Sequence, residues 1–199
     1  ATSVMGFDYQ GLKINILDTP GHKDFAEDTY RTLTAADSVI VVIDVAKGVE
    51  AQTEKLVEVC KMRDTPIIVF INKLDRFGKD AFDLLDEVEQ KLGINVHPLS
   101  WPIGQGDDFQ GVYNIYEKGL NLFSSENKQH MSDVVRVDNI KSKELDEIVG
   151  DEAAQTLRDE LELIETVYPE YTNEKYLEGK VSPVFFGSAL NNFGVEDLL

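Results

Sequence analysis

The stretch PIIVFINKLD, residues 66–75, joins an unbroken apolar run to a polar turn, and it decides the fold class. An apolar run without alternation is typical of a parallel strand covered on both faces. Similar runs occur in SVIVVID, residues 38–44, and PVFFG, residues 183–187. Strands that alternate with helical segments predict an α/β protein, with a mostly parallel sheet and helices on both of its faces.

Residues 3–17 are predicted to form an antiparallel β-hairpin ahead of this sheet. In its second half, Leu12, Ile14 and Ile16 alternate with polar residues, which is the pattern of a strand with one buried face. Helical segments are predicted at residues 24–36, about 49–60, 79–92 and 151–166.

The alternation of strands and helices is interrupted between residues 103 and 180. This part contains a predicted two-stranded ribbon, with its turn at Lys118 and Gly119, followed by an acidic helix. We interpret residues 103–180 as an α+β insertion subdomain. Residues 1–102 then form the first part of the main domain, and residues 181–199 supply its last strand and the start of its final helix.

Composition narrows the class of protein. The net charge of −18, from 19 basic and 37 acidic residues, argues against a broad electrostatic grip on nucleic-acid phosphates. No apolar run approaches the roughly 18 residues that a membrane span needs, and the amino terminus lacks the pattern of a secretory signal. Cys60 is the single cysteine and cannot form an internal disulfide. These features predict a cytoplasmic protein without a membrane partner.

Three polar signatures directly follow predicted strands. They are Asp18-Thr19-Pro20-Gly21-His22, Asn72-Lys73-Leu74-Asp75 and Gly187-Ser188-Ala189-Leu190. In a doubly wound sheet, ligands bind beyond the carboxyl ends of the strands, so these signatures are expected to meet at one edge. Taken singly, each also fits an ordinary cap, turn or surface residue. Their order and their positions after strands together predict a guanine-nucleotide site.

The second and third signatures suit the guanine base. Guanine offers two donors, N1–H and an amino group, that the single carboxylate of Asp75 can accept together, whereas adenine offers no such pair. Asn72 would tie neighbouring loops and contact the base, and the Lys73 stem would cover its ring face. Backbone N–H groups around Ser188 and Ala189 would donate to the guanine oxygen.

The first signature suits the phosphate end of the nucleotide. The Gly21 N–H can approach a terminal phosphate because no side chain intervenes. Asp18 can hold Mg²⁺ through water. His22 would then reach the water that attacks the phosphate, and would orient it.

At these residues the chain resembles the translational GTPases, and it is most similar to their bacterial peptide chain release factor three branch. The finer likeness lies in segments such as WPIGQGDDFQGVY, residues 101–113, and PVFFGSALNNFGV, residues 183–195. The resemblance implies a P-loop GTPase that uses GTP and Mg²⁺ on the ribosome to promote departure of a class-I release factor. It implies that His22 is catalytic. Two alternatives stay open, an elongation factor G-like translocation GTPase and a non-catalytic protein-interaction module.

The chain departs from that family because it contains no GxxxxGK[ST] motif. In the family, that motif and the first switch precede the segment with which this chain begins. The strand before the motif lies mid-sheet, between the strand ending at Leu17 and the strand at 38–44. We therefore expect a GTPase-domain fragment that lacks this central strand and by itself binds nucleotide and Mg²⁺ poorly or not at all. Two unpaired strand edges would remain, to be covered by direct pairing, by self-association with strand exchange, or by partial unfolding.

Overall fold

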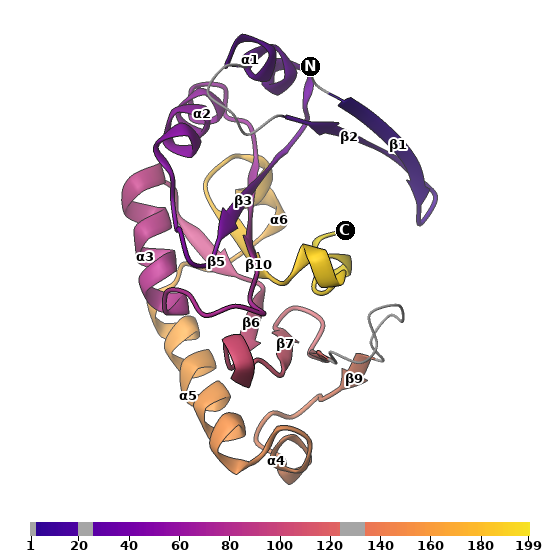
Figure 1. Cartoon of the computed structure of the whole chain (residues 1–199), viewed down its shortest axis with the longest axis vertical. Coiled ribbons are helices and arrows are strands. Elements are labelled where there is room, and N and C mark those ends of the chain that lie inside the picture. The colour runs from indigo at the N-terminus through magenta and orange to yellow at the C-terminus, as the bar shows by residue number, and fades with distance from the viewer. Residues whose placement is uncertain (1–2, 20–25, 124–133) are drawn as a thin grey trace.

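The computed structural model describes residues 3–19, 26–123 and 134–199, and shows an α/β fold built on a four-stranded parallel sheet (Figure 1). The strand order is β3-β4-β10-β5. The strands are β3 (Val39–Asp44), β4 (Ile67–Asn72), β10 (Ser182–Phe186) and β5 (Val96–Pro98). The apolar runs predicted three of these strands, whereas β5 is too short to show a pattern.

The central strands of this sheet are covered on both faces, as their sequences predict. Val69 and Ile71 are buried in the main core, while Phe70 packs on the opposite face in a second apolar cluster. Strand β3 differs, because Val42 beside Phe70 is 57% exposed. The expectation that this strand is covered on both faces is wrong, since the side chains that cover Phe70 do not extend over β3.

Three helices pack along one face of the sheet, with α5 of the insertion in line with them (Figure 1). They are α1 (Ala26–Ala35), α2 (Ala51–Met62) and α3 (Ala81–Leu92). Asp80 caps the start of α3, and its Oδ1 accepts hydrogen bonds from two backbone N–H groups. It ends at Gly93, whose φ of 61° lies in the left-handed region that glycine adopts without strain. Among the described helices, none has the length and apolar character needed to cross a bilayer.

An antiparallel sheet has the order β6-β7-β8-β9; its β7 and β8 form the predicted two-stranded ribbon, and β6 begins before residue 103, where the predicted insertion starts. Its strands are β6 (Ser100–Ile103), β7 (Gly111–Asn114), β8 (Gly119–Leu122) and β9 (Val134–Arg136). The accompanying helices are α4 (Lys143–Val149), α5 (Asp151–Val167) and α6 (Asn173–Leu177). Helix α5 confirms the predicted acidic helix, whereas α4 and α6 are too short for periodicity to reveal.

The two sheets share one apolar core. The Trp101 ring of β6 lies 4.6 Å from the Phe82 ring of α3 and 5.4 Å from the Phe186 ring of β10, measured between centroids. The Phe186 N–H also donates to the Ser100 hydroxyl at 2.9 Å. Contacts of this kind join the antiparallel sheet to the main sheet, and in Figure 1 α5 continues the row of helices below α3.

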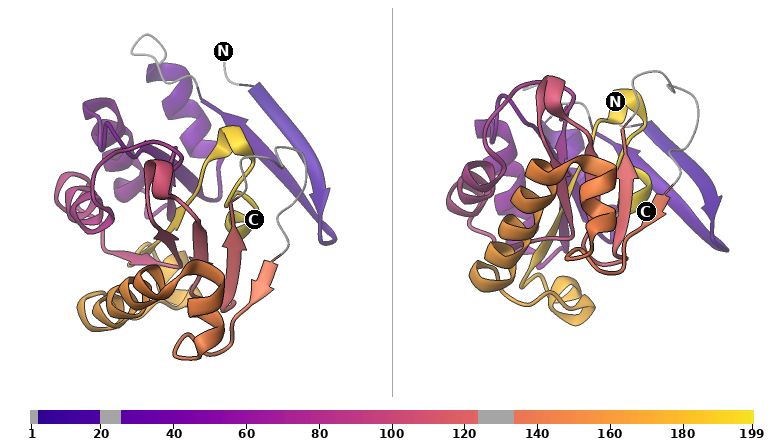
Figure 2. Two further views of the ribbon diagram at one scale, coloured as in Figure 1. Left: turned by 60° about the horizontal axis from the view of Figure 1, so that its bottom comes forward. Right: turned by 90° about the horizontal axis from the view of Figure 1, so that it is seen from below.

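The predicted hairpin is present as β1 (Ser3–Tyr9) and β2 (Leu12–Asp18), paired only with each other. It projects from the body of the molecule in every view (Figures 1 and 2). The expectation of one buried face is wrong, since Leu12 is 69% exposed and Ile16 is exposed as well. Among the described residues, β2 and β3 do not pair with each other, and most apolar side chains of the hairpin are exposed, with Ile14 and Leu17 half-buried.

Candidate functional site

The second and third signatures meet at the carboxyl edge of the parallel sheet. Asn72 ends β4, and Gly187 and Ser188 directly follow β10, its neighbour in the sheet. Asp44, which ends β3, is in register with Asn72 on the other side. Parallel strands bring their carboxyl ends together, so residues more than a hundred positions apart in sequence become adjacent here.

Asn72 joins the two loops through one side-chain oxygen. Its Oδ1 accepts the backbone N–H of Lys73 at 2.8 Å and that of Ala189 at 2.9 Å. A backbone hydrogen bond of 3.2 Å from Leu74 N–H to the Gly187 carbonyl adds a second link. Each loop therefore constrains the position of the other.

Asp75 is fixed by the other loop while its carboxylate stays partly accessible. The buried Ser188 hydroxyl donates to Asp75 Oδ1 at 2.6 Å, and Asn191 Nδ2 donates to the Ser188 hydroxyl at 2.9 Å. Within the described part of the chain, Asp75 Oδ2 has no hydrogen-bond partner. This arrangement presents an oriented carboxylate oxygen that can accept hydrogen bonds from a ligand.

The backbone donors of the third loop are already engaged. The Ser188 N–H donates to the Phe193 carbonyl at 3.0 Å, and the Ala189 N–H donates to Asn72. Both N–H groups are therefore bonded within the protein, because the loop folds back on itself, and a contact of N–H groups around these residues with a guanine oxygen stays a prediction. A Cβ at Gly187 would lie 2.3 Å from the Phe193 carbonyl oxygen, so only glycine permits this close approach.

The two leucines of these signatures have opposite surroundings. Leu74 is buried in the core, and its carbonyl accepts the Gly106 N–H of the insertion at 3.2 Å. Leu190 is 82% exposed and lies in the 3₁₀ helix Ala189–Asn191. Leu74 is therefore an anchor for the loop, whereas Leu190 is accessible to a ligand.

The insertion supports the third loop through aromatic packing. Phe193 lies edge-on to Phe109 and Phe123, with 5.6 Å between ring centroids in both cases. Phe193 is itself paired with Ser188 through two backbone hydrogen bonds. Packing in the insertion therefore reaches the residue that orients Asp75.

Sequence analysis missed Asp44, which contacts the second signature directly. Asp44 Oδ2 lies 2.7 Å from Lys73 Nζ, and Asp44 Oδ1 accepts the backbone N–H groups of Ala46 and Lys47 at 2.8 and 3.2 Å. The hydrogen bond from Lys73 holds the pKa of Asp44 below its usual value. The available signal was an acid at the end of an apolar strand, next to the strand that ends at Asn72.

The first signature lies mostly outside the described residues. Asp18 ends β2 with an exposed side chain, and Thr19 is half-buried. Pro20, Gly21 and His22, including the predicted catalytic histidine, lie outside the described residues. The described residues contain no group of three or more His, Cys, Asp or Glu side chains placed to hold a metal.

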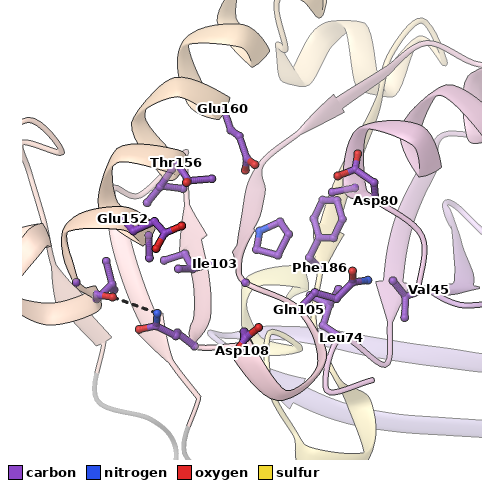
Figure 3. Close-up of a pocket in the computed structure, with 18 of the residues that line it drawn as sticks. Val45, Leu74, Asp80, Ile103, Gln105, Asp108, Glu152, Thr156, Glu160 and Phe186 are labelled. Atoms are coloured by element: carbon purple, nitrogen blue, oxygen red, sulfur yellow. Dashed lines mark hydrogen bonds between the residues drawn. The ribbon is translucent and has the colours of Figure 1, made fainter. Parts of the chain in front are cut away.

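A cavity of about 680 Å³ lies between the main sheet and the insertion (Figure 3). Leu74 and Phe186 line one wall, while Glu152, Thr156 and Glu160 of α5 line the opposite wall. Burial raises the pKa of Glu160, although the Trp101 N–H donates to its carboxylate. Most other acids around the cavity stand at the first turns of α3 and α5, where they stabilise helix ends.

Comparison with known proteins gives the family and a similar fold. A family model described as the elongation factor Tu GTP binding domain matches residues 1–199. A crystal structure of a protein from Thermus thermophilus shares the fold, with a TM-score of 0.72 at 24% sequence identity. The match covers 99% of this chain, which spans 30% of the length of that protein.

Proposed function

Because the chain belongs to the family of elongation factor Tu GTP-binding domains, we propose that the carboxyl edge of β4 and β10 reads the guanine base of GTP and GDP. The pairing of Ser188 with Asp75, next to the tie between Asn72 and Ala189, is the observation that supports this role most directly. Asp75 accepts guanine N1–H and the exocyclic amino group. Adenine carries an acceptor at N1, which the carboxylate repels.

The neighbouring residues complete the base site. Asn72 keeps the two loops together and offers its amide to the base, and the Lys73 stem covers one face of the ring. Ser188 orients Asp75 through its hydroxyl, while Ala189 and Leu190 border the same edge. Because the N–H groups of Ser188 and Ala189 are engaged within the protein, discrimination rests on the carboxylate rather than on them.

The phosphate end belongs to the first signature in this proposal. Asp18 would hold Mg²⁺, and the backbone of Thr19, Pro20 and Gly21 would contact the terminal phosphate. His22 orients the water that attacks that phosphate. When bound there, Mg²⁺ would supply positive charge to offset the charge that develops on the phosphate oxygens. Since the printed chain contains no GxxxxGK[ST] motif, its own phosphate contacts are few and hydrolysis by it is expected to be absent.

For the longer protein we propose a role in translation termination. A translational GTPase of the release factor three type promotes departure of class-I release factors from the ribosome with hydrolysis of GTP. The support is the family together with the sequence segments at residues 101–113 and 183–195. Acceleration of class-I factor release from terminated ribosomes by the longer protein, with no acceleration of translocation, is the expected result. The reverse result would favour the elongation factor G-like alternative.

Base recognition is tested directly by titrating the chain with GDP, ADP and xanthosine diphosphate in Mg²⁺, followed by calorimetry and amide chemical shifts. We expect GDP to bind with a dissociation constant of roughly 1 mM, about −4 kcal/mol, and ADP to bind more weakly. Asp75→Asn should weaken GDP about 10- to 100-fold, since an unmatched polar pair costs about 1–3 kcal/mol. The same variant should strengthen xanthosine diphosphate, because the Asn amide donates to its additional carbonyl.

Asp83→Asn, on the exposed side of α3, is the matched control and should leave all three affinities unchanged. Equal binding of GDP and ADP by the wild type would contradict guanine recognition. Absence of binding to any nucleotide, even at high concentration, would favour the protein-interaction module.

A further inference from the structure

We propose that Asp44 is a positioning residue for the base site, holding the Lys73 side chain in the direction that covers the guanine ring. This inference rests on the proposed guanine recognition and adds a residue outside all three signatures. It is carried by the contact between Lys73 Nζ and Asp44 Oδ2, 2.7 Å apart across the ends of β3 and β4.

The Asp44 carboxylate is itself fixed by its own turn. Its Oδ1 accepts two backbone N–H groups of the following residues, and its side chain is only 17% exposed. The backbone around it is held as well, since the Asp44 carbonyl accepts the Gly48 N–H at 2.8 Å and the Val45 N–H donates to the Asn72 carbonyl at 3.0 Å. The position of Asp44 Oδ2 is therefore fixed.

Lys73 needs such a partner because nothing else in the described loop fixes its long side chain. Its backbone has a φ of 71°, in the left-handed region that non-glycine residues rarely adopt, which sets the direction in which the side chain leaves the chain. A lysine loses much rotamer freedom when it is held in one conformation. If Asp44 already holds the Lys73 side chain before the base binds, this loss of entropy does not reduce the affinity for the base.

The ion pair is half-exposed and is a weak stabiliser of the fold, because solvent screens such pairs. The main consequence of the ion pair is therefore the position of the Lys73 side chain. Asp75 reads the edge of the base, whereas Lys73 contacts its face, which is common to all purines. Loss of the Asp44 contact is thus expected to weaken binding without changing which base is preferred.

The test compares wild type, Asp44→Asn, Lys73→Ala and the double variant for binding of GDP and inosine diphosphate. Asn at position 44 keeps the oxygen that accepts the turn N–H groups and removes only the charge opposite Lys73. We expect Asp44→Asn to weaken both ligands by the same factor, about three- to fivefold as for other half-exposed pairs. In the Lys73→Ala background, the change at position 44 should have no further effect.

A nucleotide-free measurement guards against a variant that folds poorly. The Lys73 ammonium protons should exchange slowly with solvent in the wild type and rapidly in Asp44→Asn. Glu58→Gln, which breaks the exposed pair with Lys61 on α2, is the control and should change neither affinity nor exchange at Lys73.

The outcomes separate this inference from the proposed function. A wild type that binds GDP no better than ADP would overturn guanine recognition and this inference together. A wild type that prefers GDP, with Asp44→Asn unchanged in affinity, would overturn the inference alone. An equal loss from Asp44→Asn with and without Lys73 would overturn it too, because the effect would then not pass through Lys73.

Discussion

The two ends of the proposed nucleotide site are built very differently. At the base end, the loops after β4 and β10 are linked by hydrogen bonds of Asn72, Leu74 and Ser188, above two largely buried strands. At the phosphate end, the β1–β2 hairpin pairs only with itself and exposes Leu12. The proposed base site is therefore held by contacts within the described chain, whereas the hairpin that leads to the proposed phosphate end lacks equivalent support there.

The largest expected effect is on stability, and it contrasts the two regions directly. Phe186→Ala should lower the free energy of unfolding by about 3–5 kcal/mol, because it removes a buried ring that contacts Trp101 between the two sheets. Phe7→Ala on the exposed hairpin is the matched change and should cost less than about 1 kcal/mol. Urea unfolding measures both. Equal costs would break the comparison, since the hairpin would then be packed as firmly as the core.

A second prediction tests the link between the base-reading loops. Asn72→Ala leaves the N–H groups of Lys73 and Ala189 without their acceptor, and should cost about 1–3 kcal/mol. Hydrogen exchange at the Ala189 amide should become faster, and GDP affinity should fall. Asn15→Ala, on the exposed face of β2, should change stability by less than about 0.5 kcal/mol. A similar small change at Asn72 would show that the loops hold their positions without it.

The elements that were predicted correctly are those that the pattern of residues within one segment determines. The apolar runs of β4 and β10, and the helical spacing of α3 and α5, each report burial directly. The edge where Asn72 and Ser188 meet was also predictable, because parallel strands always align their carboxyl ends. Pairing of Ser188 with Asp75 follows once those ends are aligned.

The errors and the omissions concern contacts that a pattern of residues cannot report. Alternation in Leu12, Ile14 and Ile16 shows which side chains share a face, but not whether anything covers that face. The exposed Val42 of β3 is the same case. The partner of Asp44 and the engaged N–H of Ala189 arise from tertiary folding, since the atoms they meet lie 29 and 117 positions away in sequence.

A third prediction isolates an ion pair that ties α3 to the main body. The Lys79 ammonium, helped by Lys91, lowers the pKa of Glu87 from 4.5 to about 2. A carboxyl group with a lowered pKa stabilises the fold above its unfolded-state pKa, and that contribution is lost as the pH falls through the folded-state value. The shift corresponds to at most about 3 kcal/mol, which screening around the half-exposed Lys79 reduces to about 1–2 kcal/mol.

Unfolding of wild type and Glu87→Gln should therefore differ at pH 7 and converge between about pH 5 and pH 2. Lys79→Met is the control. In that background Glu87 lacks its main partner, so Glu87→Gln should change the free energy of unfolding much less. If the difference in stability between wild type and Glu87→Gln stays constant down to pH 2, it arises from packing rather than from charge. Hairpin variants should not alter this difference, which separates the main body from the hairpin.

The smallest expected effect concerns the hairpin itself. Leu12→Ser should change the free energy of unfolding by less than about 0.5 kcal/mol in dilute solution, because the side chain is already 69% exposed. At high protein concentration we expect a difference instead, since exposed apolar strands with free edges favour association. Sedimentation of the wild type should then show a concentration-dependent mass that Leu12→Ser lowers. A large loss of stability in a strictly monomeric chain would mean that the hairpin packs against this same molecule, and the contrast between the two ends of the site would no longer hold.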